Sequence, residues 1–385
     1  MKKMFSNNHK ITARQVQALL LTDWTGKIML ILPALVGGLG GRNAVAGALA
    51  GLALAVAAGV LIGGTGGNKE AKGKESYLAA LEKRIGYVGA VTVRLLYGVY
   101  FLYHTALMLY LCGETAVTCL LPETEFWQVT LVAVLLGCYL AWGGLEVRGR
   151  VSELTAFVIW GLFFLMLLFS MLSLEPSQLA MSGGSLEIEP FFSCVGGVLL
   201  GFGVLGALPL IRDQVEDSNH LPGRIRNAVV LTGVLLLMVL LSGFGIFGAA
   251  GMEKLRWPVI ALMSSGRLQG IFLQRWDVLL LGLLVFGLFM SVGCGIYYLG
   301  VAADGYRSGR RGWLAAGAAV SWLLCLWMRQ SHPVLLWGAR IAFWGCTPIL
   351  FLIAVWLRLR EKLEQRRMVS GHHTGKEQDE REERQ

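Results

Sequence analysis

Long apolar runs recur along this chain and constrain its fold more than any other feature. An α-helix rises about 1.5 Å per residue, so about 20 apolar residues cross the roughly 30 Å hydrocarbon core of a bilayer. Such runs lie at residues 12–36, 43–63, 88–112, 126–143, 151–174, 191–210, 228–250, 274–302, 312–328 and 335–357. The pattern predicts an all-α polytopic membrane protein of about ten transmembrane helices.

The composition fits a helical bundle in lipid. Only 15% of the 385 residues are charged, against about a quarter in soluble proteins, and 50 are glycine. Small residues let membrane helices approach closely, which explains an excess of glycine. The cysteines stand singly in apolar surroundings without a CxxC pair or a His/Cys cluster. We therefore expect neither disulfides nor a metal site.

The net charge of +9 could indicate a nucleic-acid partner, but the placement of the charges indicates membrane topology instead. With ten spans both termini lie on one side, and most of the 34 lysines and arginines fall in the tails and loops of that side. Arg148 and Arg150, after the fourth run, are among them. The loops of the opposite side hold Arg42, Lys254, Arg256, Arg267, Arg275 and Arg329. The positive-inside rule then predicts that both termini are cytoplasmic.

The connections between the runs also carry information. Residues 77–85 place apolar and charged side chains on opposite faces, as an interfacial helix at the lipid headgroups does. The polar segment 175–190 is expected to be an external loop that divides the spans five and five. Residues 250–273 form a second long external connection, with a short helix expected at about residues 257–264.

The first run of each half is unusual in a similar way. Residues 12–36 carry charge and glycine near their centre, and residues 191–210 include Gly201, Phe202 and Gly203 in a glycine-rich stretch. Glycine-interrupted segments at corresponding positions indicate an inverted-repeat transporter, whose unwound backbone coordinates substrate near the bilayer midplane. The alternative is close helix packing through small residues.

The transporter interpretation predicts a LeuT-like fold with two inverted five-helix repeats and broken helices one and six. The repeats would cover about residues 12–174 and 191–357. One transporter-like domain would then span residues 1–361. The charged tail, residues 362–385, is expected to be a disordered cytoplasmic segment.

Two opposite charges lie near the centre of the first run. A lone charge at the bilayer centre costs at least about 2.5–3.5 kcal/mol, so Asp23 and Lys27 need a partner, and their i,i+4 spacing lets them pair with each other. They form either a self-neutralising salt bridge or a site that handles a cation or proton, with Lys27 in place of a bound sodium ion. Trp24, Thr25 and Gly26 between them belong to the same candidate site.

The third run places Tyr97, Tyr100 and His104 on one helical face. An aromatic stripe of this kind forms either a packing surface or part of a ligand site. A buried imidazole needs hydrogen-bond partners and titrates near neutrality, which favours a functional role for His104. Glu114, near the outer end of the same run, is either an interfacial residue or part of an access path.

Four stretches together resemble a known family. They are ITARQVQALLL with the later Leu32–Pro33, YFLYH followed by LLPETEFW (Leu120–Trp127), GGLEVRGRVSEL (Gly143–Leu154) and RWPVIALMSSGRLQGIFLQRWDVLLL (Arg256–Leu281). Their combination resembles the spore germination permeases. These are the B subunits of nutrient germinant receptors, within the amino acid–polyamine–organocation transporter superfamily.

The resemblance implies a ligand pocket between helices one, three, six and eight. It also implies an A-type membrane subunit and a C-type lipoprotein as partners in the spore inner membrane, with lipid around the bundle. Gly26 matches a glycine at the break of helix one, and Tyr100 matches an aromatic pocket position. Lys27 departs from the family where a small residue is expected, and Gly203 stands where many relatives carry glutamate, so the ligand chemistry is expected to differ.

Two functions follow. The first is a receptor subunit that binds an amino acid or similar small nutrient near mid-membrane and signals germination. The second is an amino-acid permease or exchanger that works by alternating access. No phosphate-binding loop, nucleophile elbow or HExxH motif occurs, and the glycine pattern at residues 201–206 lies inside an apolar run. We therefore expect neither an enzyme nor a cofactor.

Overall fold

The fold was taken from a computed structural model that describes residues 10–64, 77–181, 187–265, 276–304, 310–357 and 359–360. The predicted tail, residues 362–385, lies outside the described residues. Within the described part every regular element is a helix, and one isolated bridge joins Ile11 to Val215. This confirms the predicted all-α class.

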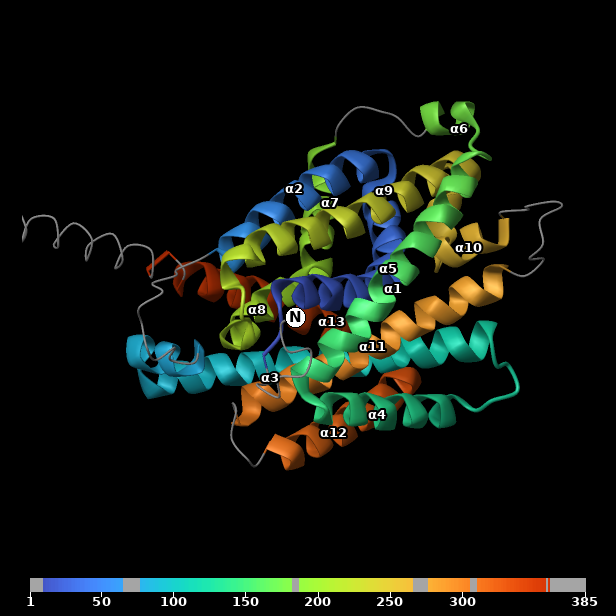
Figure 1. The fold of residues 1–385 in the computed structure, drawn as a ribbon. Coiled ribbons are helices and arrows are strands. Elements are labelled where there is room, and N and C mark those ends of the chain that lie inside the picture. Colours follow the sequence, from blue (N-terminus) through green and yellow to red (C-terminus); the bar gives the residue numbers. More distant parts are fainter. Residues whose placement is uncertain are drawn as a thin grey trace, which may run out of the picture.

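The α-helices are numbered along the chain as in Figure 1. They are α1 (Ala13–Gly40), α2 (Ala44–Gly63), α3 (Tyr77–Cys119), α4 (Phe126–Trp142), α5 (Gly144–Met171), α6 (Pro176–Met181), α7 (Ile188–Gly201), α8 (Leu208–Ile211), α9 (Leu221–Lys254), α10 (Pro258–Ser265), α11 (Trp276–Asp304), α12 (Arg310–Gln330) and α13 (His332–Ala339). Short 3₁₀ turns are η1 (Gly41–Asn43), η2 (Gly203–Ala207), η3 (Arg212–Gln214) and η4 (Ser218–His220), and η5 (Arg340–Cys346) is a π-helix.

The helices account for the predicted spans. Among the described residues, eight helices are long and apolar enough to cross a membrane, and Ile188–Gly201 with Gly203–Gln214 forms one more span, bent by 46°. The shorter apolar helix α4 matches the remaining predicted run, at residues 126–143. The chain is therefore a multi-pass membrane protein.

Helix α1 forms the centre of the bundle and packs against α5, α7, α9 and α11. Its most apolar stretch is 83% buried inside the protein, against 28% for that of α5. A capping box between Thr12 and Gln15 starts the helix, because the Thr12 side chain accepts from the Gln15 amide while the Gln15 side chain accepts from the Thr12 amide. The charges of α1 therefore face other helices, not lipid.

The break expected in the first run is not found, so this prediction was wrong. Helix α1 continues from Ala13 to Gly40, through Gly26 and past Pro33. The Thr25 hydroxyl donates to the Leu21 carbonyl (2.6 Å), and Lys27 bonds Asp23 one turn away, both within a regular helix. The side chains of Asp23, Thr25 and Lys27 thus form bonds with i,i+4 spacing that a regular helix provides, without an unwound backbone.

The break expected in the sixth run is present. Helix α7 ends at Gly201, Phe202 leaves the helix, and the chain continues as the 3₁₀ turn η2 before α8. Helix α3 has a separate kink at Gly86, where φ is 76°, a conformation that favours glycine. The kink separates the amphipathic stretch that begins at Tyr77 from the membrane span, in agreement with the sequence pattern.

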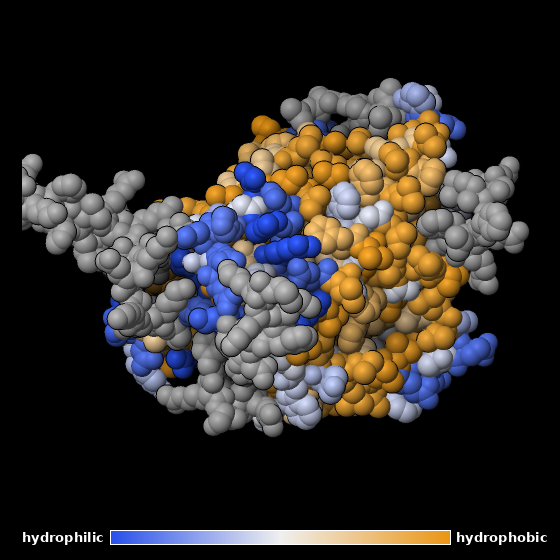
Figure 2. All heavy atoms as spheres, in the orientation of Figure 1, coloured by the Kyte–Doolittle hydropathy of each residue, from blue (hydrophilic) through white to orange (hydrophobic). Residues whose placement is uncertain are grey.

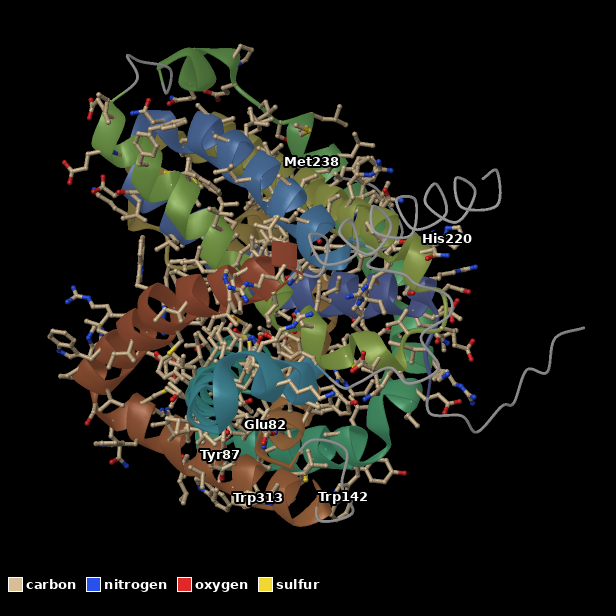
Figure 3. The ribbon with its side chains drawn as sticks, turned by 90° about the vertical axis from the view of Figure 1, so that its left-hand side faces the viewer. Glu82, Tyr87, Trp142, His220, Met238 and Trp313 are labelled. Carbon is tan, nitrogen blue, oxygen red and sulfur yellow. The ribbon has the colours of Figure 1, made fainter. Side chains whose placement is uncertain are left out.

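The outer surface suits a lipid environment. Figure 2 shows a broad apolar surface, with hydrophilic residues gathered toward the left and the lower right of the view. Tyr87, Trp142 and Trp313 are 69%, 54% and 54% exposed, and Trp142 and Trp313 lie toward the lower edge of the bundle in Figure 3. Aromatic side chains are enriched at membrane–water interfaces, where an apolar ring carries a polar group.

Glu114 ties helices together near the end of α3. Its carboxylate lies 3.4 Å from Arg256, after α9, and 3.7 Å from Arg329, at the end of α12. Arg256 also bonds the Tyr110 hydroxyl. Glu114 is therefore a linking residue between three elements. The short helix α10 follows Arg256, as predicted for residues 257–264.

Candidate functional site

The Asp23–Lys27 pair lies in the interior of the bundle. Lys27 Nζ donates to Asp23 Oδ2 at 2.5 Å, and both side chains are less than a tenth exposed. The Ser291 hydroxyl of α11 lies 2.6 Å from Asp23 Oδ1 and 2.9 Å from the Asp23 main-chain oxygen. Both carboxylate oxygens of Asp23 are thereby engaged, one by α1 itself and one by α11.

His104 joins this pair from α3. Its Nε2 lies 3.3 Å from Lys27 Nζ. Because a protonated lysine only donates, Nε2 must accept, and the ring proton of the neutral imidazole then resides on Nδ1. His104 Nδ1 is buried without a hydrogen-bond partner among the described residues. One charged cluster therefore links α1, α3 and α11.

Tyr97 provides a hydrogen-bond donor for a backbone carbonyl at the break of the sixth span. Its hydroxyl donates to the Gly206 carbonyl at 2.7 Å, inside η2. A 3₁₀ turn at membrane depth leaves carbonyls that an α-helix would have satisfied, so this bond stabilises the break. On the other side, the rings of Trp24 and Phe202 meet edge to face at 4.8 Å. Helices α1 and α3 thus both contact the break.

Tyr100 and Gly203 meet at a third contact. A Cβ on Gly203 would lie 3.0 Å from the Tyr100 hydroxyl and 2.8 Å from Thr347 Cγ2. A side chain at this position would clash, because Tyr100 and Thr347 approach the Gly203 backbone closely. Thr347 follows η5, and its hydroxyl donates to the Ala342 carbonyl. π-helical turns often occur at functional sites.

The remaining predicted residues pack helices together. A Cβ on Gly26 would lie 2.6 Å from the carbonyl carbon of Gly287, so α1 and α11 are in backbone contact there. A Cβ on Gly201 would lie 2.7 Å from Leu32. Thr25 is buried and bonded within its own helix. Gly26 and Gly201 therefore both lie at close helix contacts, and Gly201 is also the last residue of α7 before the break.

Arg148 was expected in a cytoplasmic loop at the membrane surface, but its side chain is buried. Arg150 is partly exposed and bonds Glu146, whereas Arg148 is 1% exposed. The guanidinium carbon lies 5.1 Å from the centre of the Tyr297 ring, and the side chain contacts Cys294 on the same helix, α11. Arg148 and Arg150 are thus two residues apart on α5 but lie on different faces of it. The face of Arg148 is packed against α11, and the face of Arg150 is exposed.

Several polar atoms of this region have no hydrogen-bond partner among the described residues. They are Trp24 Nε1, His104 Nδ1, and Nε and Nη1 of Arg148. More than nine in ten buried polar groups in proteins are hydrogen-bonded. His104 and Arg148 both lie against α11, near Gly295 and Cys294, and Trp24 follows Asp23 on α1. The region where α1, α3, α5 and α11 meet is therefore a candidate binding site for a polar molecule.

Sequence reasoning missed Ser291, Thr347 and the inward position of Arg148. Ser291 and Thr347 are isolated hydroxyl residues within apolar runs, and such residues often hydrogen-bond between membrane helices. Arg148 precedes the apolar part of α5, a position that fits an interfacial residue as well as a buried one. Arg148 and Arg150 differ only in the face of α5 on which they lie.

Comparison with known proteins places these features in a family. The sequence profile described as spore germination protein matches residues 66–307, more than half of the chain. The chain belongs to the spore germination protein family. Spore germination protein B2 of Bacillus subtilis (strain 168) is 25% identical over 174 residues, which cover 44% of this chain and 45% of that relative. The matched part thus spans less than half of the relative's length.

The fold of this spore germination family member resembles that of a solved transporter. Mhp1, a nucleobase-cation-symport-1 family transporter in a closed conformation with bromovinylhydantoin bound, aligns with a TM-score of 0.57 and 13% identity. The alignment covers 90% of this chain and 80% of Mhp1. The LeuT-like transporter architecture is therefore confirmed. Family and fold together mark a membrane transporter or receptor subunit rather than an enzyme.

Proposed function

We propose that this protein is the integral membrane subunit of a spore nutrient germinant receptor. It binds an amino acid or similar small nutrient near mid-membrane and signals germination. The observation that carries the proposal is the group of unpaired buried donors on Trp24 and His104, next to the Asp23–Lys27 pair. The family adds a role in germination. Bound nutrient would supply the missing hydrogen-bond partners.

The site extends over the residues that meet at the break. Trp24 and Phe202, Tyr97 and Gly206, and Tyr100 and Gly203 connect α1 and α3 to the bent span. A ligand that changes these contacts changes the angle of the sixth span. Such a shift requires that the ligand bind the two conformations of the span with different affinities.

The proposed setting is the spore inner membrane, with both termini cytoplasmic and lipid around the bundle. An A-type membrane subunit and a C-type lipoprotein subunit complete the receptor. The two inverted repeats, residues 12–174 and 191–357, remain a prediction. They would explain why the first and sixth spans meet through Trp24 and Phe202.

The test is deletion of the gene, followed by a panel of nutrients applied to purified spores. The deleted strain should lose its germination response to at least one nutrient, and the intact gene should restore it. An unchanged response to every nutrient, in a strain without a redundant homologue, would contradict the receptor role.

A complementing gene with Lys27→Met links the response to the candidate site. The variant should change the nutrient concentration that gives half-maximal germination by at least about tenfold, because one charged hydrogen bond contributes about 1.5–3 kcal/mol. Lys254→Met is the matched control, since Lys254 is exposed at the end of α9. If both variants respond to the same nutrient concentrations, Lys27 has no part in nutrient binding.

The second candidate is an amino-acid permease or exchanger, favoured by the transporter fold. Counterflow in proteoliposomes distinguishes it from the receptor. If the purified chain alone exchanges labelled nutrient across the bilayer, the permease function holds. A chain that binds the nutrient without exchanging it functions as a receptor.

A further inference from the structure

The charged side chains buried in the described part of the bundle do not balance. They are Asp23, Lys27 and Arg148, one carboxylate against two cations. Asp23 is engaged on one oxygen by Lys27 and on the other by Ser291. The interior therefore holds one excess positive charge, carried by Arg148. An unpaired charge inside a membrane protein is costly, so such a charge usually has a partner or a function.

The nearest carboxylates along the helix of Arg148 are occupied elsewhere. Glu146 bonds Arg150, and Glu153 pairs with Arg14 at 3.1 Å. Arg148 itself meets the ring of Tyr297 and the thiol of Cys294. A ring face and a thiol stabilise a guanidinium only weakly compared with an anion. Its Nε and Nη1 keep their hydrogens without an acceptor among the described residues.

Arg148 and the Asp23–Lys27 pair border the same part of α11. Arg148 contacts Cys294 and Tyr297 of this helix. Ser291 lies one turn earlier on α11 and bonds Asp23. Asp23 and Arg148 thus contact α11 within about two turns of each other, at Ser291 and at Cys294 and Tyr297.

All of the unpaired groups at this junction are donors. The indole nitrogen of Trp24 and the guanidinium nitrogens of Arg148 carry hydrogens only, and His104 Nδ1 carries the ring proton while Nε2 accepts from Lys27. A molecule that satisfies them must present acceptors. Together with the excess positive charge, this selects an anion.

We propose that Arg148 binds the carboxylate of the nutrient, and that the ligand of this protein is a carboxylate-bearing molecule whose negative charge balances the buried centre. The inference rests on the proposed function for the nutrient, but the anion site can be tested separately. Arg148 is then a specificity-determining residue. Asp23 and Lys27, already paired, contribute no net charge to the choice of ligand.

The test measures thermal unfolding of the purified full-length chain with simple probes. Sodium acetate is compared with sodium chloride at equal ionic strength and with the neutral acetamide. Acetate should raise the Tm, because a ligand that binds the folded state stabilises it by mass action. Arg148→Gln should weaken this response about tenfold or more in apparent affinity, and Arg148→Lys should retain part of it. Arg150→Gln, on the same helix but partly exposed, should behave as the wild type.

A second measurement guards against a variant that is merely misfolded. Without ligand, Arg148→Met should have a Tm equal to or above that of the wild type, because it removes an uncompensated buried charge. Equal effects of acetate, acetamide and chloride, or an acetate response that survives in Arg148→Gln, would overturn the proposal. A lower Tm of ligand-free Arg148→Met would overturn it too, since Arg148 would then be structurally paired.

The same assay with nutrients keeps the two proposals distinct. Amino acids that stabilise the chain should lose the effect when their α-carboxylate is replaced by an amide. If amide and acid stabilise equally, the anion site is wrong and the nutrient site stands. If acetate acts through Arg148 but no amino acid stabilises the chain, the anion site stands and the amino-acid nutrient is wrong.

Discussion

Gly26 of α1 and Gly287 of α11 meet backbone to backbone. A Cβ on Gly26 would lie 2.6 Å from both the Gly287 carbonyl carbon and the Leu288 nitrogen. This approach brings Asp23 within reach of Ser291, one turn away on each helix. The position of the charged cluster therefore depends on the absence of a side chain at Gly26.

Gly26→Ala should destabilise the protein. The methyl group must push α1 away from α11, and overpacking of this kind costs about 1–3 kcal/mol. Gly282→Ala is the matched control, because a Cβ on Gly282, also on α11, meets nothing within 4 Å. Thermal unfolding in detergent should show a lower Tm for Gly26→Ala and an equal or slightly higher Tm for Gly282→Ala, since alanine favours a helix.

Replacing one member of the Asp23–Lys27 pair should destabilise the protein more than replacing both. Asp23→Asn or Lys27→Met alone leaves a buried charge uncompensated, at a cost of about 3–5 kcal/mol. The double variant removes both charges and should recover much of the lost stability. A double-mutant cycle of unfolding measures this coupling. Additive losses would show that the two side chains do not interact as a pair.

Gly203→Ala should disturb the break of the sixth span. The new Cβ would press on Thr347 and on the Tyr100 hydroxyl, whereas a Cβ on Gly206 would meet Leu350 at an ordinary 3.6 Å. We expect Gly203→Ala to lower the Tm and the response to nutrient, and Gly206→Ala to change both little. The larger side chain of Gly203→Glu should be more damaging still, because Tyr100 and Thr347 occupy the space beside Gly203.

Tyr97→Phe should loosen the same break. It removes the bond to the Gly206 carbonyl and leaves a buried acceptor unsatisfied, which costs about 1–3 kcal/mol. Tyr139→Phe is the control, since Tyr139 is 76% exposed on α4. Unfolding of the two variants by denaturant compares the losses. Equal stability would mean that the hydroxyl of Tyr97 does not hold the 3₁₀ turn.

Apolar run length predicted the spans because bilayer thickness imposes it directly. The boundaries of α2 and α4 differ from the predicted ones by about one residue. Gly201 and Gly203 correctly indicated a break, since two close glycines weaken a helix. Gly26 gave the same signal and a different outcome, because a glycine also serves where two helices touch. Sequence alone does not tell which of the two uses applies.

The charges and aromatics of the candidate site stand out in the sequence, whereas its small polar residues do not. Asp23, Lys27 and His104 stand out because charge and imidazole are rare in apolar runs, and the structure brings them together. Ser291 and Thr347 are ordinary residues whose roles arise from helix rotation. Arg148 was assigned to the surface because sequence gives its depth only to within a helical turn. Its burial depends on which face of α5 meets α11.

We expect the nutrient to bind where α1 and α3 meet the break of the sixth span. Hydrogen exchange of the reconstituted chain, measured with and without the nutrient that triggers germination, locates the bound ligand. Bound ligand should slow amide exchange at residues 202–207, which lie outside regular α-helix, and on the facing turns of α1 and α3. Protection confined to the segment around α10, with unchanged exchange at residues 202–207, would contradict the account.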